Sequence, residues 1–241
     1  MNHPVEGFSD QQLQLARLLY KSGAVQADAK NGFITRANRV GESDLLSPLY
    51  VNLRDEEHRR KPGPLSMQGF DLIGSMLYDT LMRLGVAYDV IAPVPDAGHA
   101  IARALQRRLT LAGKNTPLVH FEKKGEDIVL DEAVIGRLGS KARVLVLDDV
   151  ISAGGSKLPV IRSLREVGVL VNDCAVCLDR EEGGISLLKH HDVGLTALLS
   201  LTKLAEIGRQ HYPEIVTEEA YAAHLRYLEG VTQERQVLHL R

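Results

Sequence analysis

The sequence contains two adjacent acids followed by a run of small residues, a combination that could bind a sugar phosphate. Asp148 and Asp149 end the apolar run VLVL, and the segment SAGGS follows at 152–156. A helix that starts after such a loop offers unpaired backbone N–H groups and the positive end of its dipole to a phosphate group. Two carboxylates beside a phosphate would repel it unless they bind the hydroxyls of an attached sugar or a divalent cation. A sugar phosphate would therefore satisfy both halves of the segment.

A simpler alternative is a structural turn. In that interpretation Asp149 or Ser156 caps a helix, and the two glycines only make the turn tight. The segment matches neither the GxGxxG pattern nor a P-loop, which disfavours dinucleotide and ATPase sites.

The elements that must position this segment alternate between helix and strand. Apolar residues at helical spacing predict helices near 70–84, 101–109, 155–168, 185–191 and 202–210, and short apolar runs predict strands at 88–94, 117–121, 143–149, 173–179 and 195–201. This alternation is typical of an α/β fold with a largely parallel sheet flanked by helices. In such sheets ligands bind beyond the carboxyl ends of the strands, which is where the two acids would lie.

We expect one structural domain with three parts. Residues 1–63 would form an N-terminal helix and hood region, residues 64–211 the core, and residues 212–241 a C-terminal helical tail. The first helix is predicted at 9–21, where Ser9 can act as its cap.

Two segments lie outside the regular pattern. The charged run at 54–63 indicates a solvated loop. The tail reads as a weakly amphipathic helix with Tyr221, Leu225 and Leu228 on the face that docks on the domain or a partner.

Composition excludes several classes of protein. The chain has 241 residues, 44% of them hydrophobic, which is enough for one substantial core. A formal net charge of −2 predicts no nucleic acid partner and no anionic membrane surface. No apolar run approaches the roughly 20 residues of a membrane span, and the N-terminus lacks the pattern of a secretion signal. We therefore expect a cytoplasmic protein with no membrane partner.

The two cysteines, Cys174 and Cys177, have the spacing of a redox or half-zinc motif. In a strand, however, residues three apart point to opposite faces, and no second pair exists to complete a zinc site. We expect both to pack in the core.

The segment VLVLDDVISAGGS resembles the phosphoribosyl diphosphate (PRPP) signature of the type I phosphoribosyltransferases. The resemblance implies their fold, a mainly parallel sheet flanked by helices with a small N-terminal hood. It also implies that the catalytic acids Asp148 and Asp149 hold the 2- and 3-hydroxyls of the ribose, while residues 152–156 hold its 5-phosphate. The PRPP-binding segment would comprise Asp148, Asp149, Val150, Ile151, Ser152, Ala153, Gly154, Gly155 and Ser156.

A second segment narrows the resemblance to one base. LDREEGG at 178–184 is similar to the base-binding stretch of the orotate phosphoribosyltransferases, in which the matching Arg binds orotate. The fork of Arg180 suits the planar carboxylate of that pyrimidine, although such a segment taken alone is usually a salt-bridged turn. SPLYVNLR at 47–54 resembles the family's segment that lines the orotate pocket, which implies roles for Tyr50 and Val51 there, together with Ser152.

The family's pyrophosphate loop also has a counterpart. PVPDAGHAIA at 93–102 resembles the loop after a strand that receives pyrophosphate, which would involve Pro95, Asp96, Ala97 and Gly98.

One segment departs from the family pattern. The family has a basic loop that closes over PRPP, and Lys123 and Lys124 match its first pair, so that both would bind PRPP and Lys124 would act in catalysis. Asp127 stands where the family carries its catalytic Lys, and Val129 stands where it carries His. Loss of a cation near departing pyrophosphate should cost rate, by about 2 to 4 kcal/mol in activation free energy.

The resemblance as a whole implies an orotate phosphoribosyltransferase that acts on orotate and PRPP as a homodimer. Mg²⁺ would be its cofactor, bound through substrate oxygens and water rather than directly by side chains. Two alternatives stay open: a transferase of the same fold for another base, and a regulatory PRPP-binding or nucleotide-binding protein without turnover, which the altered basic loop favours.

Overall fold

The computed structural model describes residues 7–39, 43–58, 61–95, 97–119, 121–124, 127–130, 139 and 141–239. Within these ranges, the side chains of 36–37, 122–124, 127–130 and 236–239 are not described. The chain forms two compact units. The first unit comprises residues 1–65, 179–183 and 199–241, and the second comprises residues 66–178 and 184–198. The segments expected as hood and tail are thus both in the first unit.

The second unit is built on a four-stranded sheet. Its strands are β3 (Val90–Pro93), β6 (Arg143–Ile151), β7 (Leu170–Asp179) and β8 (Gly194–Ser200), in that order across the sheet. β3 and β6 run parallel, with Val90 opposite Val144 and Pro93 opposite Leu147. The parallel sheet predicted from the alternating pattern is confirmed.

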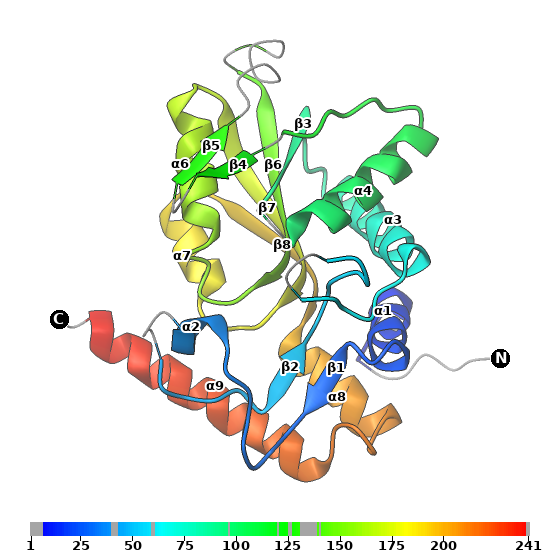
Figure 1. Cartoon of the computed structure of the whole chain (residues 1–241), viewed down its shortest axis with the longest axis vertical. Helices are drawn as coiled ribbons and strands as arrows, with labels where there is room; N and C mark the ends of the chain where they lie inside the picture. The colour runs from blue at the N-terminus through cyan, green and yellow to red at the C-terminus, as the bar shows by residue number, and fades with distance from the viewer. Residues whose placement is uncertain are drawn as a thin grey trace. The chain divides into compact units, whose positions relative to one another are not determined.

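Helices cover both faces of this sheet. Helices α3 (Met67–Arg83) and α4 (Gly98–Leu111) pack against each other on one side, and α6 (Lys157–Glu166) and α7 (Gly184–His190) lie on the other (Figure 1). Apolar side chains of the strands and of α6 fill the core beneath α6 and α7, including Val144, Val146, Val160, Ile161, Leu164, Cys174 and Val176. The three layers are those of an α/β fold.

Both cysteines are free and buried in β7, as expected. Burial raises the pKa of the Cys174 thiol to about 12, and burial likewise raises the pKa of Cys177. Neither thiol is ionised at neutral pH, so both behave as small apolar side chains.

The polar stretch before β6 contains a hairpin that the sequence did not predict. β4 (Phe121–Lys124) pairs antiparallel with β5 (Asp127–Leu130), and Lys124 lies opposite Asp127. Of the strand predicted at 117–121, the described residues show a bridge between Leu118 and Ile91 of β3 and, at Phe121, the first residue of β4. Pro117 limits the pairing with β3, because a proline cannot donate to a sheet ladder.

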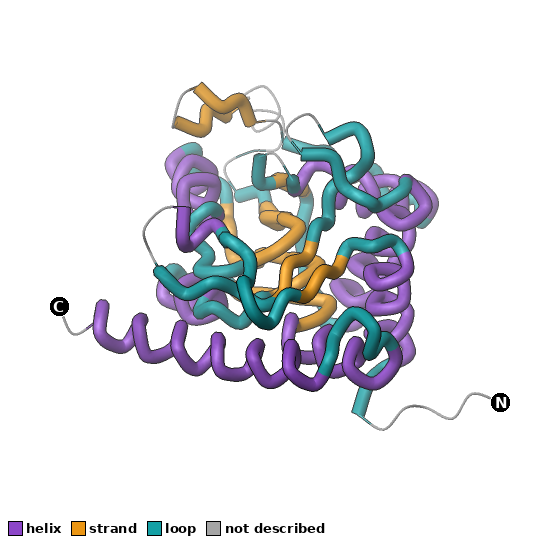
Figure 2. The backbone as a smooth tube through the Cα atoms, turned by 60° about the horizontal axis from the view of Figure 1, so that its bottom comes forward, coloured by secondary structure: helices purple, strands orange, loops and turns teal. Residues whose placement is uncertain are grey.

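The first unit contains a small sheet and four helices among the residues that the structure describes. Its elements are α1 (Asp10–Lys21), β1 (Val25–Ala27), α2 (Arg36–Arg39), β2 (Leu49–Val51), α8 (Leu201–His211) and α9 (Glu218–His239). β1 and β2 are antiparallel, with Gln26 opposite Tyr50. Ser9 caps α1 in a capping box with Gln12, as the sequence predicted for Ser9. Figure 2 shows α9 as one unbroken helix.

The predicted face of α9 is not buried on the domain, and its docking on a partner stays a prediction. Leu225 is exposed, and Tyr221 and Leu228 are only partly buried. The buried face of α9 consists of Ala220, His224, Tyr227 and Val231. Two of these four side chains are polar, so a search for an apolar stripe misses them. None of the helices in the described ranges has both the length and the apolar character needed to cross a membrane.

Candidate active site

The two acids lie at the end of β6, as the strand prediction required. Asp148 is buried, and Asp149 is less enclosed. Asp148 accepts a hydrogen bond from the backbone N–H of Asp149, and Asp149 accepts one from the N–H of Val150 at 2.7 Å. Ser156 holds the N-cap position of α6 but makes no capping bond with its side chain. Neither carboxylate nor Ser156 caps the helix, which contradicts the capping part of the structural-turn alternative.

The proximity of the two acids changes the acidity of one of them. Burial, and next the negative charge of Asp148, raise the pKa of Asp149 to about 7. A carboxyl group in that range gains or loses its proton near neutral pH. The strand end is therefore a stronger acceptor of hydrogen bonds from hydroxyl groups when Asp149 is ionised.

Lys157, the first residue of α6, compensates the charge of Asp148. Its Nζ lies 2.6 Å from Asp148 Oδ2, 2.6 Å from the carbonyl oxygen of Val150 and 3.3 Å from Ser156 Oγ. The side chain of Lys157 is 2% exposed. The ammonium group thus joins the strand end to the loop that follows it, and Asp149 is left as the acid without this partner.

The loop between Ile151 and α6 leaves space next to its backbone. Gly154 has a φ of 89°, a conformation that side chains with a Cβ rarely adopt. Gly155 is exposed, and a Cβ there would meet no atom within 4 Å. Ser152 and Ala153 are half-buried, so a small anion can reach the backbone and the Ser152 hydroxyl. This open loop at the start of a ten-residue helix has the form of a phosphate site.

The loop expected to receive pyrophosphate lies beside the same strand end. α4 begins at Gly98, where a Cβ would stand 2.6 Å from the carbonyl oxygen of Leu147 and 3.4 Å from the Cα of Asp148. Only a residue without a side chain allows this approach. Pro95 and Ala97 precede Gly98 in this loop, and Asp96 lies outside the described residues.

The segment predicted to bind the base belongs to the first unit and is organised around Arg180. The guanidinium Nε donates to Glu182 Oε1 at 2.7 Å, and Nη2 donates to Ser47 Oγ at 2.9 Å. Arg180 is 7% exposed. The salt-bridged turn considered for this segment is thus present, and Nη1 of Arg180 takes part in neither of these bonds.

Tyr50 stands on β2 in the same unit with two cations at its hydroxyl. Lys61 Nζ lies 2.7 Å from the hydroxyl oxygen and over the ring at 4.4 Å from its centroid, and Arg54 Nη1 lies at 3.5 Å. Burial acts to raise the pKa of Tyr50, but Lys61 and Arg54 together lower it overall. The loop predicted to be solvated at 54–63 is exposed at Glu56, Glu57 and Lys61, as expected, although Lys61 and the half-buried Arg54 also contact Tyr50. The side chain of Val51 packs in the core of the unit.

Relatives in sequence identify the family. An orotate phosphoribosyltransferase of Leptospira biflexa is 32% identical over 160 residues, which cover 66% of this chain and 82% of the relative. One of Cenarchaeum symbiosum is 29% identical over 206 residues, covering 83% and 88%. No protein-family model matches the chain. The chain belongs to the orotate phosphoribosyltransferase family.

Coverage of the relatives is uneven. The chain spans 63% of the orotate phosphoribosyltransferase of Halobacterium salinarum, to which it is 30% identical over 110 residues. Among solved structures, that of the orotate phosphoribosyltransferase of Aeropyrum pernix matches with a TM-score of 0.60 at 24% identity, covering 80% of this chain and 97% of that one. At this identity the structural match supports the fold alone.

The roles of several predicted site residues remain predictions. The backbones of Lys123 and Lys124 lie in β4, but their side chains are outside the description. Ser152 belongs to the second unit and Tyr50 and Arg180 to the first, and each group is described within its own unit.

Several contacts of the predicted site groups were not predicted: Lys157 contacts Asp148, Arg54 and Lys61 contact Tyr50, and Ser47 contacts Arg180. Tyr227 contacts Glu182, the salt-bridge partner of Arg180. For Lys157 the only signal in the sequence is a cation directly after a segment with two acids. Tyr227 gave no signal, because the family resemblance ends before the tail.

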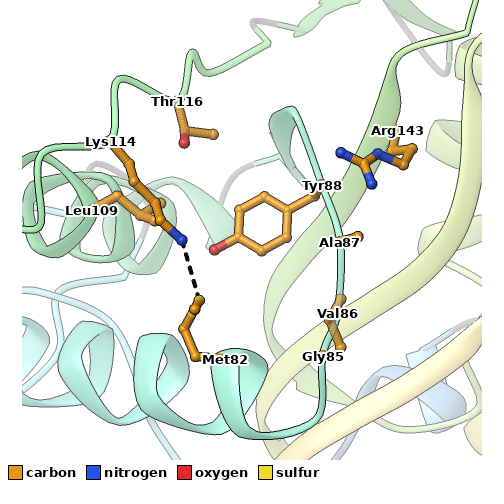
Figure 3. Close-up of a pocket in the computed structure, with 9 residues that line it drawn as sticks. All are labelled: Met82, Gly85, Val86, Ala87, Tyr88, Leu109, Lys114, Thr116 and Arg143. Atoms are coloured by element: carbon orange, nitrogen blue, oxygen red, sulfur yellow. Dashed lines mark hydrogen bonds between the residues drawn. The ribbon is translucent and has the colours of Figure 1, made fainter.

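A hollow in the second unit lies away from the family's expected site. It has a volume of about 330 Å³ and is lined by residues around Tyr88, Lys114 and Arg143 (Figure 3). Tyr88 and Arg143 precede or begin the strands β3 and β6, so the hollow is at the amino ends of these strands. Ligands of parallel sheets bind at the opposite, carboxyl ends. We therefore assign neither substrate to this hollow.

Proposed function

We propose that this chain is an orotate phosphoribosyltransferase, which transfers the 5-phosphoribosyl group of PRPP to orotate and so serves the biosynthesis of UMP. The products are orotidine 5'-monophosphate and pyrophosphate. The observation that carries the proposal is the end of β6, where Asp148 and Asp149 lie next to an open glycine-containing loop and to the close approach of Gly98. The family membership supports orotate as the base.

In this reaction a bond forms between a ring nitrogen of orotate and C1 of the ribose. The bond from C1 to the pyrophosphate oxygen breaks, its electron pair leaves with pyrophosphate, and the proton of the ring nitrogen is released to water. No protein nucleophile is needed, so catalysis would come from holding the substrates and stabilising charge. Ionised Asp149 would accept hydrogen bonds from the ribose hydroxyls. The loop 152–156 would bind the 5-phosphate.

On the base side, Arg180 would bind the carboxylate of orotate. A guanidinium is permanently charged, and its Nη1 takes part in neither the bond to Glu182 nor the bond to Ser47. The cations at Tyr50 would add positive potential for an anionic base. A pyrimidine without a carboxylate would lose the contact with Arg180.

Mg²⁺ would be the cofactor. Among the described residues no three His, Cys, Asp or Glu side chains form a group that could hold a metal ion. The open loop next to Asp149 leaves room for the phosphate oxygens and water through which Mg²⁺ would bind, rather than directly through a side chain. The ion would neutralise the charge that accumulates on pyrophosphate. We also propose that the enzyme is a homodimer and acts in the cytoplasm, as the family pattern suggests.

The activity is tested by the loss of orotate absorbance with purified protein, PRPP and Mg²⁺, with each component omitted in turn. Consumption that depends on all of them is expected, and it would show that the altered loop from Lys123 to Asp127 suffices. The variant Arg180→Ala should lose orotate consumption and still bind PRPP in calorimetry. If it kept orotate consumption, the carboxylate-binding role of Arg180 would be wrong.

Two alternatives have distinct outcomes in the same assay. Consumption of another base in place of orotate would indicate a transferase of different specificity. Binding of PRPP without consumption of any base would favour a regulatory protein, which Asp127 at the family's Lys position supports. In that case Asp127→Lys would be the next variant, because it restores the missing charge.

A further inference from the structure

Helix α9, which lies outside the resemblance seen in the sequence, contacts the segment that contains Arg180. The hydroxyl of Tyr227 donates to Glu182 Oε1 at 2.9 Å, and the same oxygen accepts the bond from Arg180 Nε. All of these residues are in the first unit. Tyr227 is therefore linked to the guanidinium of Arg180 through one carboxylate oxygen, and its hydroxyl also interacts with Arg180 directly.

Burial makes this link well defined. Glu182 is 2% exposed and Tyr227 is 6% exposed, so water has little access to replace either hydrogen bond. Burial, and next the charge of Glu182, raise the pKa of Tyr227 far above the neutral range. The hydroxyl keeps its proton and acts as a donor. Two donors on one oxygen hold the carboxylate in one orientation, and the carboxylate in turn orients Arg180.

The same helix contacts neighbouring positions of this turn. One helical turn before Tyr227, the buried His224 lies with Nε2 3.1 Å from Thr202 Oγ1, and the N–H of Thr202 donates to Glu181 Oε2 at 2.8 Å. Near the end of α9, the guanidinium of Arg235 packs closely on Gly183. A Cβ at Gly183 would stand 2.5 Å from Nη1 of Arg235. The whole turn 181–183 thus rests on α9 or on residues that α9 contacts.

The geometry points to Tyr227 as a positioning residue for orotate recognition, acting through Glu182 to hold the guanidinium of Arg180 toward the carboxylate of the base. This inference rests on the proposed function. Tyr227 would contact neither substrate, and its effect would be confined to bases that carry a carboxylate.

The test is the variant Tyr227→Phe, which removes the hydroxyl and keeps the ring. Tyr221→Phe on the same helix is the matched control, because the contact of its ring with Arg209 survives the change. In Tyr227→Phe we expect the KM for orotate to rise about fivefold to tenfold, while the KM for PRPP and the kcat stay within about twofold. The inhibition constant of uracil, which lacks the carboxylate, should not change. Thermal unfolding of both variants reports on the fold.

Each outcome decides the inference. Equal KM values for orotate in the two variants, with an active wild-type enzyme, would overturn the role of Tyr227 and leave the proposed function standing. A parallel rise for orotate, uracil and PRPP would also overturn it, because it would show a general structural effect. A wild-type protein that consumes no orotate would overturn the proposed function and this inference together. If Tyr227→Phe does not fold, Glu182→Gln tests the same link and should raise the KM for orotate in the same selective way.

Discussion

The buried contact between Lys157 and Asp148 makes a measurable prediction about stability. The variant Lys157→Met keeps a long, flexible side chain of similar shape but removes the ammonium group. It leaves the carboxylate of Asp148 buried and without its cation, and it removes the bonds to the carbonyl of Val150 and to Ser156 Oγ. We expect the strand end of β6 and the loop after it to lose their common anchor.

The magnitude follows from the burial of both partners. The side chains of Lys157 and Asp148 are 2% and 7% exposed, so solvent cannot take the place of the lost partner. Breaking a buried pair by removing one member costs about 3 to 5 kcal/mol in the free energy of unfolding. Domains of this kind are stable by about 5 to 15 kcal/mol in total, so the variant should be markedly less stable.

Urea denaturation followed by circular dichroism measures this loss. The double variant Asp148→Asn with Lys157→Met removes the unpaired charge and should regain more than half of the stability. Lys203→Met, an exposed lysine on α8, is the control and should change stability by less than about 0.5 kcal/mol. A loss below about 1 kcal/mol in Lys157→Met would refute the reasoning, as would a double variant less stable than the single one.

Four further predictions follow from burial and acidity. The KM for PRPP should fall as the pH rises from about 6 to 8, because the pKa of Asp149 is raised to about 7 and the ionised form accepts hydrogen bonds from the ribose hydroxyls more strongly. Asp149→Asn should remove this dependence. Because of the same raised pKa, the folded state keeps the proton of Asp149 to a higher pH than the unfolded state does. The contribution of Asp149 to the free energy of unfolding should therefore decline between about pH 4 and 7 and stay level above pH 7. Urea titrations at several pH values would detect this decline. Cys174 and Cys177 should react with a thiol reagent only on unfolding, and rapid labelling of the native protein would contradict their burial. Tyr20→Phe should cost about 1 kcal/mol in urea denaturation, because it removes the buried bond from the hydroxyl to the carbonyl of Leu204 at 2.8 Å.

The sequence predicted the elements whose pattern is local. β6 and α6 could be placed because an apolar run, two acids and a small-residue loop follow one another without interruption. Helix α1 was similarly marked by Ser9 at its start. In these cases residues close together in the chain determine the element, so the sequence alone is sufficient to predict where it lies.

The contacts that the sequence did not predict join residues far apart in the chain or depend on polar burial. Tyr227 and Glu182 are 45 positions apart, and a tyrosine in a tail helix has no pattern that specifies its partner. Lys157 would ordinarily be read as solvent-exposed, because lysine is rarely buried without a partner. The partner becomes evident only when β6 and α6 are folded together.

The most direct test of the account is to measure the amounts of orotidine 5'-monophosphate and pyrophosphate formed from orotate, PRPP and Mg²⁺ by the wild-type protein and by Asp149→Asn. The account predicts equal amounts of the two products from the wild type, and a rate at least about 100-fold lower in the variant, as for the loss of an electrostatic contact in a transition state. Product formation at an unchanged rate in Asp149→Asn would contradict the assignment of the active site to the end of β6. Absence of both products from the wild-type protein would contradict the proposed reaction itself.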